Sequence, residues 1–495
     1  MRNCIHVILW GQEIGSLMWR DESHNSYFLY NPDYLKSPIE PFPLIAPKPS
    51  MPLRAFDSEG RKYQDLPAFF ADSLPDDWGN TLFEQWYADQ HLPIAGMTPL
   101  YKLAFIGQRG MGALEFRPDE QVMPYAEPVD VGELARLAHK IFVDREKARI
   151  APGEALTKQL LMAVGTSAGG RQPKAIIAIH RDTDEIRSGQ IAGMEGYDYY
   201  ILKFGDKTRS SAELEMTYYQ MAIDAGIDMM PCHIREVDGE KHFLTQRFDR
   251  INGEKIHIQT LAAIDPNADS YEKLMLDCRR LHMPDSTGEE IFRRMVFNYL
   301  ANNTDDHTKN VAFMMTQQGR WSLAPAYDIT FIFNTGGYQP ERQHCMLMRG
   351  KVSGWTKDEV LQFARANGVR GAEKIIAQVA KAIRSFSNYA AQNNVAPEWI
   401  ARINACITAH LEEWGLVNGE EMKAKSMRLK DGREVTNVYV EQAYKGNIHL
   451  WATIDGKPRK YIFRPTASEY TEILRHNISE TPMAKLLEWV EKYLC

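Results

Sequence analysis

The pattern of hydrophobic and polar residues predicts short β-strands at the beginning of this chain. Residues 4–10 and 15–19 are two such runs, and Gly11-Gln12 between them is typical of a hairpin turn. Three further features are expected before residue 120: a proline-rich loop or extended edge at 38–52, helices over 66–92 on both sides of a turn at 73–79, and a glycine turn entering a strand at 107–116. We expect these elements to form an N-terminal α/β subdomain over residues 1–125.

In residues 126–270, the spacing of hydrophobic residues predicts helices in some segments and strands in others. Residues 130–148 carry an apolar stripe at helical spacing and predict an amphipathic helix. Residues 211–225 predict a second helix, closed by Gly226. Four short runs are β-like: 175–180, 199–204, 233–237 and 242–247. A strand-rich lobe is therefore expected over residues 126–270.

Helical periodicity dominates from residue 271 to about 424. Residues 287–290 match a capping box, and a wide apolar stripe from Ile291 to Leu300 predicts a buried helix. A strand-rich lobe followed by a helical lobe is typical of an α+β protein with a cleft between two lobes. Strands return at 437–442, 448–454 and 459–464, and residues 482–494 predict a closing helix. Residues 425–495 are therefore expected to form a small α+β extension.

Composition narrows the class of protein. The 495 residues are 44% hydrophobic and 25% charged, as in an ordinary globular protein of two to four domains. The net charge of −7 argues against broad nucleic-acid binding, and the basic run at 423–433 is interpreted as a solvated linker. Six scattered cysteines exclude a disulfide framework and suit a reducing compartment. The first residues do not resemble a signal peptide and no apolar run would span a membrane, so we expect a cytoplasmic protein.

The most informative chemistry lies directly after the buried helix, in the sequence Asn302-Asn-Thr-Asp-Asp-His-Thr-Lys-Asn310. Asp305 lies on a loop that this helix anchors, which is where a general base is held rigidly and still reaches solvent. The alternative is that Asp and Asn only make the turn, which both residues favour. His307, Asn310 and a second carboxylate, Asp328, weigh against that alternative.

Two apolar runs, 311–315 and 321–323, predict a β-hairpin between Asn310 and Asp328. Paired strands would place the two flanking side chains next to each other, where their oxygens could share one Mg²⁺. His307 has two open interpretations: it orients the loop, or it is a satisfied core histidine.

A second group of residues could hold phosphates. The run Gly165-Thr-Ser-Ala-Gly-Gly-Arg-Gln-Pro-Lys174 is rich in glycine, and its backbone amides and Lys174 could approach phosphate oxygens. A strand follows it rather than a helix, so it is not a Walker loop. Lys203 ends the next apolar strand, which is the kinase arrangement for binding nucleotide phosphates. Its glutamate partner is expected on helix 211–225, where we prefer Glu215 to Glu213.

Residues 246–250, Gln-Arg-Phe-Asp-Arg, end the last strand of this lobe. An inter-lobe hinge there would offer backbone groups to adenine. The pattern Arg247 to Arg250 taken alone favours a different interpretation, a surface ion-pair cluster.

These parts resemble one family, the HipA-like serine/threonine kinases that are toxins of bacterial toxin–antitoxin pairs. Seven pieces of the sequence carry the resemblance, in the family's order: residues 73–79, 110–114, 167–174, 201–203, 247–250, 303–310 and 324–329. The resemblance implies a two-lobed protein-kinase-like fold with a family-specific N-terminal subdomain. It also implies ATP and Mg²⁺ as cofactors.

The resemblance assigns roles to the matching positions. Asp305 would be the catalytic base, and Asn310 and Asp328 the metal ligands. Ser167 matches the autophosphorylation position, where phosphate would add nearly two negative charges to a phosphate-binding loop and so inhibit it. The residues implied to bind ATP are Gly169, Gly170, Arg171, Gln172, Pro173, Lys174, Lys203, Gln246, Arg247, Phe248, His307, Asn310, Tyr327 and Asp328.

The resemblance also implies partners. Related toxins phosphorylate translation factors, notably an aminoacyl-tRNA synthetase, and a small helix-turn-helix antitoxin of the HipB type restrains them and binds the operator. DNA would therefore be contacted only through the antitoxin. Two other functions stay open: a nucleotide-binding pseudokinase that acts as a corepressor, and a metal-dependent phosphohydrolase or nuclease that uses Asp305, Asp306 and His307.

Overall fold

The computed structural model of the chain divides into two compact units. The first comprises Met1–Ile332 and Arg342–Val395, and the second Phe333–Glu341 and Ala396–Cys495. The predicted boundaries at 125, 270 and 424 stay predictions, and helix α13 (Pro397–Glu413) falls in the second unit. The residues that the structure describes are 3–50, 53–89, 96–119, 128–143, 172–190, 192–332, 343–416, 427–442, 448–455, 457–463 and 489–494.

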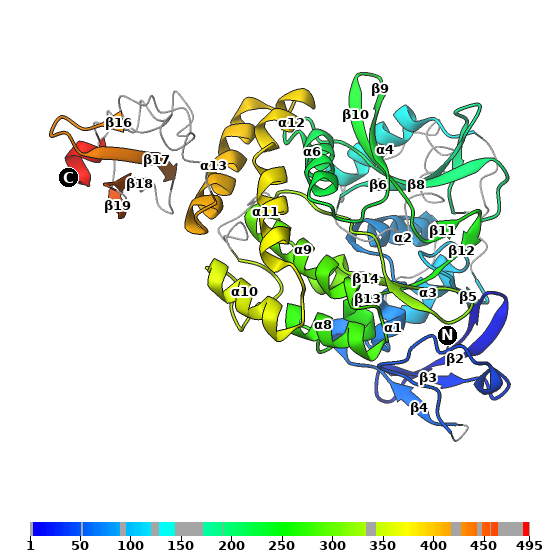
Figure 1. Cartoon of the computed structure of the whole chain (residues 1–495). Coiled ribbons are helices and arrows are strands. Elements are labelled where there is room, and N and C mark those ends of the chain that lie inside the picture. Colours follow the sequence, from blue (N-terminus) through cyan, green and yellow to red (C-terminus); the bar gives the residue numbers. More distant parts are fainter. Residues whose placement is uncertain are drawn as a thin grey trace. The chain divides into compact units, whose positions relative to one another are not determined.

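The first unit begins with an antiparallel sheet of order β4-β3-β2-β1-β5 (Figure 1). The predicted hairpin is confirmed, since β1 and β2 pair from Cys4 to Gln12. A Cβ at Gly15 would lie 2.2 Å from the carbonyl oxygen of Leu29, so only glycine permits this close pairing of β2 with β3. The strands are β1 (Cys4–Leu9), β2 (Gln12–Arg20), β3 (Asn25–Tyr30), β4 (Ala55–Asp57) and β5 (Leu114–Arg117).

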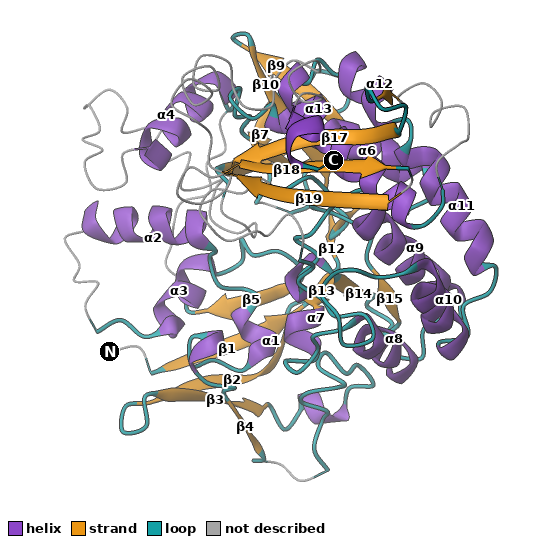
Figure 2. Ribbon diagram, turned by 90° about the vertical axis from the view of Figure 1, so that its left-hand side faces the viewer, coloured by secondary structure: helices purple, strands orange, loops and turns teal. Residues whose placement is uncertain are grey.

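Two short helices cover this sheet (Figure 2). Phe69 and Phe70 of α1 and Leu103 of α3 share one buried core with strand residues such as Leu17 and Phe28. The helices of this part are α1 (Ala68–Ala71), α2 (Asp77–Asp89) and α3 (Pro99–Ile106), with 3-10 turns at Tyr34–Lys36 and Arg61–Tyr63. The predicted turn between α1 and α2 is confirmed.

A second antiparallel sheet has the order β7-β6-β8-β10-β9. Helix α4 packs on it through Leu134 and Ala138, which share a core with Ala175, Ile177 and Leu202. Helix α6 lies between this sheet and the helices α11 and α12 (Figure 1). The elements are β6 (Lys174–His180), β7 (Ile186–Ser188), β8 (Tyr197–Lys203), β9 (Cys232–Val237), β10 (Glu240–Gln246), α4 (Val131–Val143) and α6 (Ser211–Asp224).

The remaining part of the first unit is mainly helical. Its predicted hairpin is confirmed as β14 and β15, and β13, which was not predicted, pairs with the other edge of β14. The elements are β11 (Arg250–Ile251), β12 (Glu254–Lys255), β13 (His257–Thr260), β14 (Ala312–Met315), β15 (Trp321–Leu323), α7 (Leu261–Ile264), α8 (Tyr271–Arg280), α9 (Ser286–Leu300), α10 (Lys357–Ala366), α11 (Ala372–Ile383) and α12 (Phe386–Gln392), with a 3-10 turn at Thr308–Asn310.

The buried stripe of α9 is confirmed, because Ile291, Met295 and Leu300 are all buried. The capping box predicted at 287–290 is wrong. Helix α9 begins at Ser286, and its N-cap, Asp285, makes no capping hydrogen bond through its side chain. The structure has a capping box between Thr356 and Glu359 instead, at the start of α10.

The second unit contains α13 and an antiparallel sheet of order β16-β17-β18-β19. Trp489 and Val490, in a helical segment at 489–493, share a core with Leu450 and Ile454. The predicted strands of the C-terminal extension are therefore confirmed. They are β16 (Met427–Arg428), β17 (Glu434–Gln442), β18 (Ile448–Ile454) and β19 (Lys457–Phe463).

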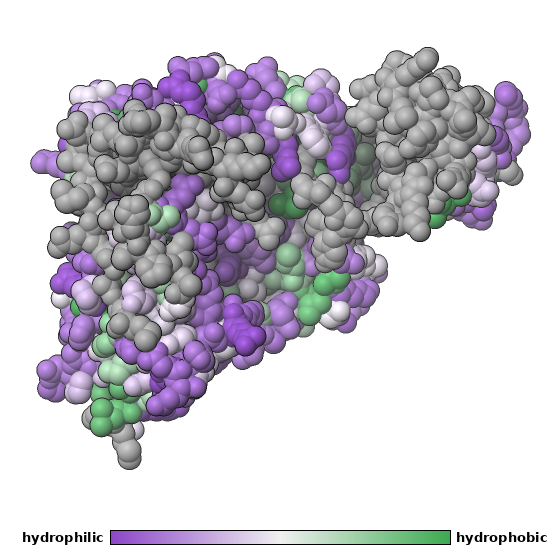
Figure 3. All heavy atoms as spheres, turned by 180° about the vertical axis from the view of Figure 1, so that it is seen from behind, coloured by the Kyte–Doolittle hydropathy of each residue, from purple (hydrophilic) through white to green (hydrophobic). Residues whose placement is uncertain are grey.

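The described surface is mainly hydrophilic on the face shown in Figure 3, where hydrophobic atoms form separate small groups. Large exposed hydrophobic side chains are few among the described residues, and only Tyr461 and Ile462 share an element, β19: Leu53, Ile223, Ile251, Leu276, Tyr461 and Ile462. Within the described ranges, no helix combines the length and the apolar character that crossing a membrane requires.

Candidate functional site

Four charged side chains meet where β6, β8 and α6 come together. Lys174 begins β6 and Lys203 ends β8, and the two are cross-strand neighbours in the sheet. Lys203 Nζ lies 2.5 Å from Glu215 Oε2 on α6 and also contacts Asp328 Oδ1. The predicted pairing of Lys203 with Glu215 is confirmed, whereas Glu213 pairs with Lys241. We call Lys174, Lys203, Glu215 and Asp328 the lysine–carboxylate cluster.

Burial and mutual attraction determine the charges in this cluster. Burial alone would lower the pKa of Lys203, but Asp328 and Glu215 raise it above its usual range. Burial alone would raise the pKa of Asp328, but Lys203 and Lys174 hold it below its usual value. The pKa of Lys174 is lowered, chiefly by burial. Lys203 and Asp328 are therefore a charged pair at neutral pH.

The two adjacent aspartates after α9 point in different directions. Asp306 is buried, where it accepts hydrogen bonds from Tyr271 Oη at 2.7 Å and Cys345 N at 2.7 Å and pairs with His344 Nδ1 at 3.0 Å. The Asp305 side chain is 44% exposed. Asp306 therefore anchors the loop from inside and leaves Asp305 accessible. The two carboxylates do not form the joint Asp-Asp-His cluster that the phosphohydrolase alternative needs.

His307 and Asn310 lie beside Asp305. His307 Nε2 is 3.8 Å from Asp305 Oδ1, and the His307 side chain is 41% exposed, so the interpretation of His307 as a core histidine is wrong. Asn310 Nδ2 donates to the Asp305 backbone carbonyl at 2.8 Å. Both contacts stabilise the loop around the accessible carboxylate.

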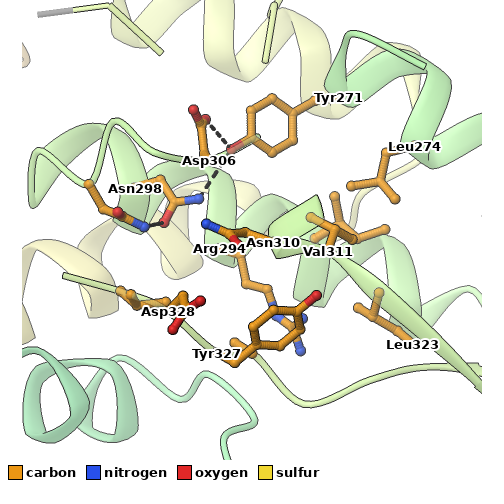
Figure 4. Close-up of a pocket in the computed structure, with 14 residues that line it drawn as sticks. Tyr271, Leu274, Arg294, Asn298, Asp306, Asn310, Val311, Leu323, Tyr327 and Asp328 are labelled. Atoms are coloured by element: carbon orange, nitrogen blue, oxygen red, sulfur yellow. Dashed lines mark hydrogen bonds between the residues drawn. The ribbon is translucent and has the colours of Figure 1, made fainter. Parts of the chain in front are cut away.

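Asn310 and Asp328 line the same pocket (Figure 4). The β14–β15 hairpin brings them together, as its strand pairing predicted. Tyr327, beside Asp328, donates from its hydroxyl to the Lys309 carbonyl at 2.7 Å. The pocket therefore presents two oxygen-bearing side chains of the kind that Mg²⁺ prefers.

At the predicted hinge, 246–248, the backbone amides of Gln246 and Arg247 are engaged within the protein. Gln246 N donates to Pro231 O at 3.0 Å, and Arg247 N donates to Tyr199 O at 2.8 Å. The ring of Phe248 faces that of Tyr327, with centroids 5.7 Å apart and planes at 32°. A flat base would find aromatic contacts there.

Two family models match the chain: the HipA N-terminal domain over residues 5–117 and the HipA-like C-terminal domain over residues 166–386. The chain belongs to the HipA-like proteins. The loop of Asp305 and the Tyr327-Asp328 pair lie within the range that the HipA-like C-terminal domain matches.

Two known proteins are similar to this chain. One solved structure that is similar to the HipA-like chain comes from a complex of Shewanella oneidensis HipA, HipB and operator DNA, with 17% identity and a TM-score of 0.58 over 83% of this chain and 97% of that one. This likeness confirms the predicted α+β, protein-kinase-like fold. A putative kinase of Haemophilus influenzae is 26% identical over 191 residues, which are 34% of this chain and 53% of the relative. The match thus spans about half of that relative's length.

One sequence-based interpretation of the HipA-like chain is wrong. Arg247, Asp249 and Arg250 do not form a surface cluster, because their side chains are fully buried. Arg247 Nη2 and Arg250 Nη1 lie 2.8 and 2.7 Å from Asp249 Oδ2, which also accepts from Gly112 N at 2.7 Å. We call these three residues the buried triad. Through Gly112, the buried triad joins the N-terminal subdomain to the strand-rich lobe. The Arg247 guanidinium is bound to Asp249 within this triad.

Two residues beside the site, Asp76 and Trp78, were not predicted as part of it. Asp76 Oδ2 lies 3.7 Å from Lys174 Nζ, and Trp78 Nε1 donates to the Lys174 carbonyl at 3.1 Å. The signal for them was the segment 73–79, which carried the family resemblance without a role.

Part of the predicted nucleotide loop is not described. Ser167, Gly169, Gly170 and Arg171 lie outside the described residues. Of the remaining loop positions, Gln172 is exposed, and the Pro173 carbonyl accepts a hydrogen bond from Phe204 N at 3.1 Å.

Proposed function

We propose that this HipA-like chain is an ATP- and Mg²⁺-dependent serine/threonine protein kinase. The observation that carries the proposal is the lysine–carboxylate cluster next to the loop of Asp305, since Lys203 contacts both Glu215 and Asp328. A strand lysine paired with a helix glutamate, together with a metal-binding aspartate, is the arrangement that protein kinases require for activity.

The residues of the site fit both cofactors. Asn310 and Asp328 would hold the metal through oxygen, and the Phe248 and Tyr327 rings would contact the base. Lys203 and Lys174 would bind phosphate oxygens as cations. When bound, ATP supplies the phosphoryl group, and Mg²⁺ offsets the charge of its phosphates.

Asp305 would accept the proton of the substrate hydroxyl. Its carboxylate is accessible, and Asn310 holds the loop through the Asp305 carbonyl. His307 Nε2 lies 3.8 Å from this carboxylate. The chain's own residues thus position a hydroxyl and receive its proton, without any covalent bond to the protein.

We further propose that the kinase is a growth-arresting toxin that acts on a translation-related protein, such as an aminoacyl-tRNA synthetase. The solved structure of Shewanella oneidensis HipA is a complex with HipB and operator DNA. By analogy, a small helix-turn-helix antitoxin would inhibit the activity of this chain, and the antitoxin rather than this chain would contact DNA.

Incubation of the purified chain with radiolabelled ATP and Mg²⁺ tests the proposal. We expect labelling of the chain itself and of a discrete protein in a bacterial lysate. Labelling that needs no Mg²⁺ would contradict the proposed metal site. ATP binding without any labelling would instead favour the pseudokinase corepressor.

Replacing Asp328 by Asn should lower activity by about 100-fold or more, because the amide carries no charge for the metal or for Lys203. The remaining activity should need a higher Mg²⁺ concentration, which a magnesium titration of initial rates measures. Asp269→Asn is the control, since Asp269 is an exposed carboxylate that pairs with Lys273 in the same lobe. An unchanged titration curve for Asp328→Asn would refute its role as a metal ligand.

Replacing Ser167 by Ala should abolish autophosphorylation of the glycine-rich loop and leave phosphorylation of the protein substrate intact. Phosphopeptide mass spectrometry of the 161–172 region measures this. Thr166→Ala is the matched control, and the double variant shows whether the neighbouring hydroxyl substitutes. Thr166 and Ser167 are the only hydroxyl-bearing residues of this region, so undiminished autophosphorylation of the double variant would place the modified residue elsewhere in the chain.

A further inference from the structure

Asp76 joins the N-terminal subdomain to the lysine–carboxylate cluster. It precedes helix α2, and its Oδ1 accepts a hydrogen bond from Gly79 N at 2.6 Å, as a helix-capping residue does. Trp78, in the first turn of α2, is fully buried in the core of the strand-rich lobe. The start of α2 is therefore held firmly against the beginning of β6.

The second carboxylate oxygen of Asp76 faces Lys174. Asp76 Oδ2 lies 3.7 Å from Lys174 Nζ, and the two side chains are only 13% and 3% exposed. In so buried a place, a charge needs a partner of opposite sign. Burial raises the pKa of Asp76 to about 6, although Lys174 opposes this.

Lys203 is the cross-strand neighbour of Lys174, so the two ammonium groups repel each other. The charges that act on Lys174 are Asp328, Asp76, Lys203 and Glu215. Lys203 makes close contacts with Glu215 and Asp328, so both of these carboxylates are already engaged. Asp76 is thus the carboxylate that faces Lys174 from the side of the N-terminal subdomain.

We infer that Asp76 is a positioning residue that holds Lys174 toward the phosphates of the bound nucleotide. The inference rests on the proposed kinase function. It gives the N-terminal subdomain a direct part in phosphate binding, through one carboxylate on a helix that the subdomain supplies. Asp76 does not touch the nucleotide and acts only through Lys174.

Replacing Asp76 by Asn separates this role from helix capping. The amide oxygen of Asn can still accept from Gly79 N, whereas the negative charge facing Lys174 is lost. We expect the KM for ATP and the Kd for MgATP to rise about tenfold, with a much smaller change in kcat. The Kd for adenosine, which has no phosphates, should not change.

The matched control is Asp77→Asn. Asp77 is the next residue, and it is exposed. It loses the same charge at the same helix end, so any effect of net charge or of the helix dipole appears in both variants. Thermal unfolding of both variants reports whether either change disturbs folding.

A double-mutant cycle tests whether Asp76 acts through Lys174. Lys174→Met keeps the length of a side chain that is almost fully buried. In this background, Asp76→Asn should have no further effect on the affinity for MgATP. A merely structural role of Asp76 would instead add its full effect to that of Lys174→Met.

The possible outcomes are distinct. A wild-type chain that neither binds MgATP nor transfers phosphate overturns the proposed function and this inference with it. An active wild type whose Asp76→Asn variant binds MgATP normally overturns the inference alone. Equal loss of adenosine and MgATP affinity, or additive effects in the cycle, would also refute it.

Discussion

Replacing Asp305 by Asn should lower the rate of phosphoryl transfer by about 1000-fold and leave the affinity for MgATP close to that of the wild type. The amide has the same size but cannot accept the proton of the substrate hydroxyl. The Asp305 side chain is 44% exposed, so the variant loses little packing. Activity and folding are therefore separable at this position.

Single-turnover labelling of the protein substrate measures the rate, and calorimetric titration with MgATP measures the affinity. Asp285→Asn is a suitable control, because Asp285 is an exposed aspartate in the same lobe that makes no capping hydrogen bond. A variant Asp305→Asn that labels its substrate at nearly the normal rate would show that another group is the base.

Local sequence patterns were enough to predict the hairpin and the lysine–glutamate pair that form this site. The apolar runs on both sides of residues 316–320 identified the β14–β15 hairpin, and the hairpin brings Asn310 and Asp328 to one pocket. The pairing of Lys203 with Glu215 was predicted correctly because Glu215, unlike Glu213, shares a helix face with Tyr218 and Ala222. In each case the spacing of hydrophobic residues predicts which residues lie on the same face of a strand or helix.

The different roles of Asp305 and Asp306 were not predictable from the pattern. Both residues lie in a loop, which has no period to indicate a buried side. Asp306 is buried because Tyr271, His344 and the backbone of Cys345 surround it. These partners lie more than 30 positions away, so only the folded chain shows which aspartate is accessible.

Long-range partners explain the other differences as well. Trp78 and Lys174 are 96 positions apart, and Arg250 and Gly112 are 138 apart. Charged residues that lie close together in the sequence, such as those from Arg247 to Arg250, are usually exposed. This tendency favoured the interpretation as a surface cluster. Arg250 donates to the Gly110 and Gly112 carbonyls, and Arg247 donates to the Gly189 carbonyl. No pattern within 246–250 reports these distant partners.

The capping box at 287–290 failed for a local reason. Asp285, Ser286 and Thr287 are all good N-cap residues, so the sequence offers three neighbouring starts for α9. The chain starts the helix at Ser286, before the predicted box. Pattern matching locates such a helix but not its first residue.

Replacing Asp249 by Asn should lower the free energy of unfolding of the first unit by about 3–5 kcal/mol. The change leaves two buried guanidinium groups without the carboxylate that neutralises them. It also weakens the acceptor for Gly112 N, which joins the N-terminal subdomain to the strand-rich lobe. Urea unfolding followed by circular dichroism measures the loss.

Asp238→Asn is the control for this change, because its pair with Arg136 is about two-thirds exposed and should contribute less than about 1 kcal/mol. Burial alone would raise the pKa of Asp249, but Arg247 and Arg250 hold it well below its usual range. A carboxyl group with a lowered pKa stabilises the fold above its unfolded-state pKa of about 3.9 and loses this effect as the pH falls. The difference between wild type and Asp249→Asn should therefore stay constant from neutral pH to about pH 5 and shrink below about pH 4. A difference that shrinks already near pH 6 would show that other groups carry the stabilisation.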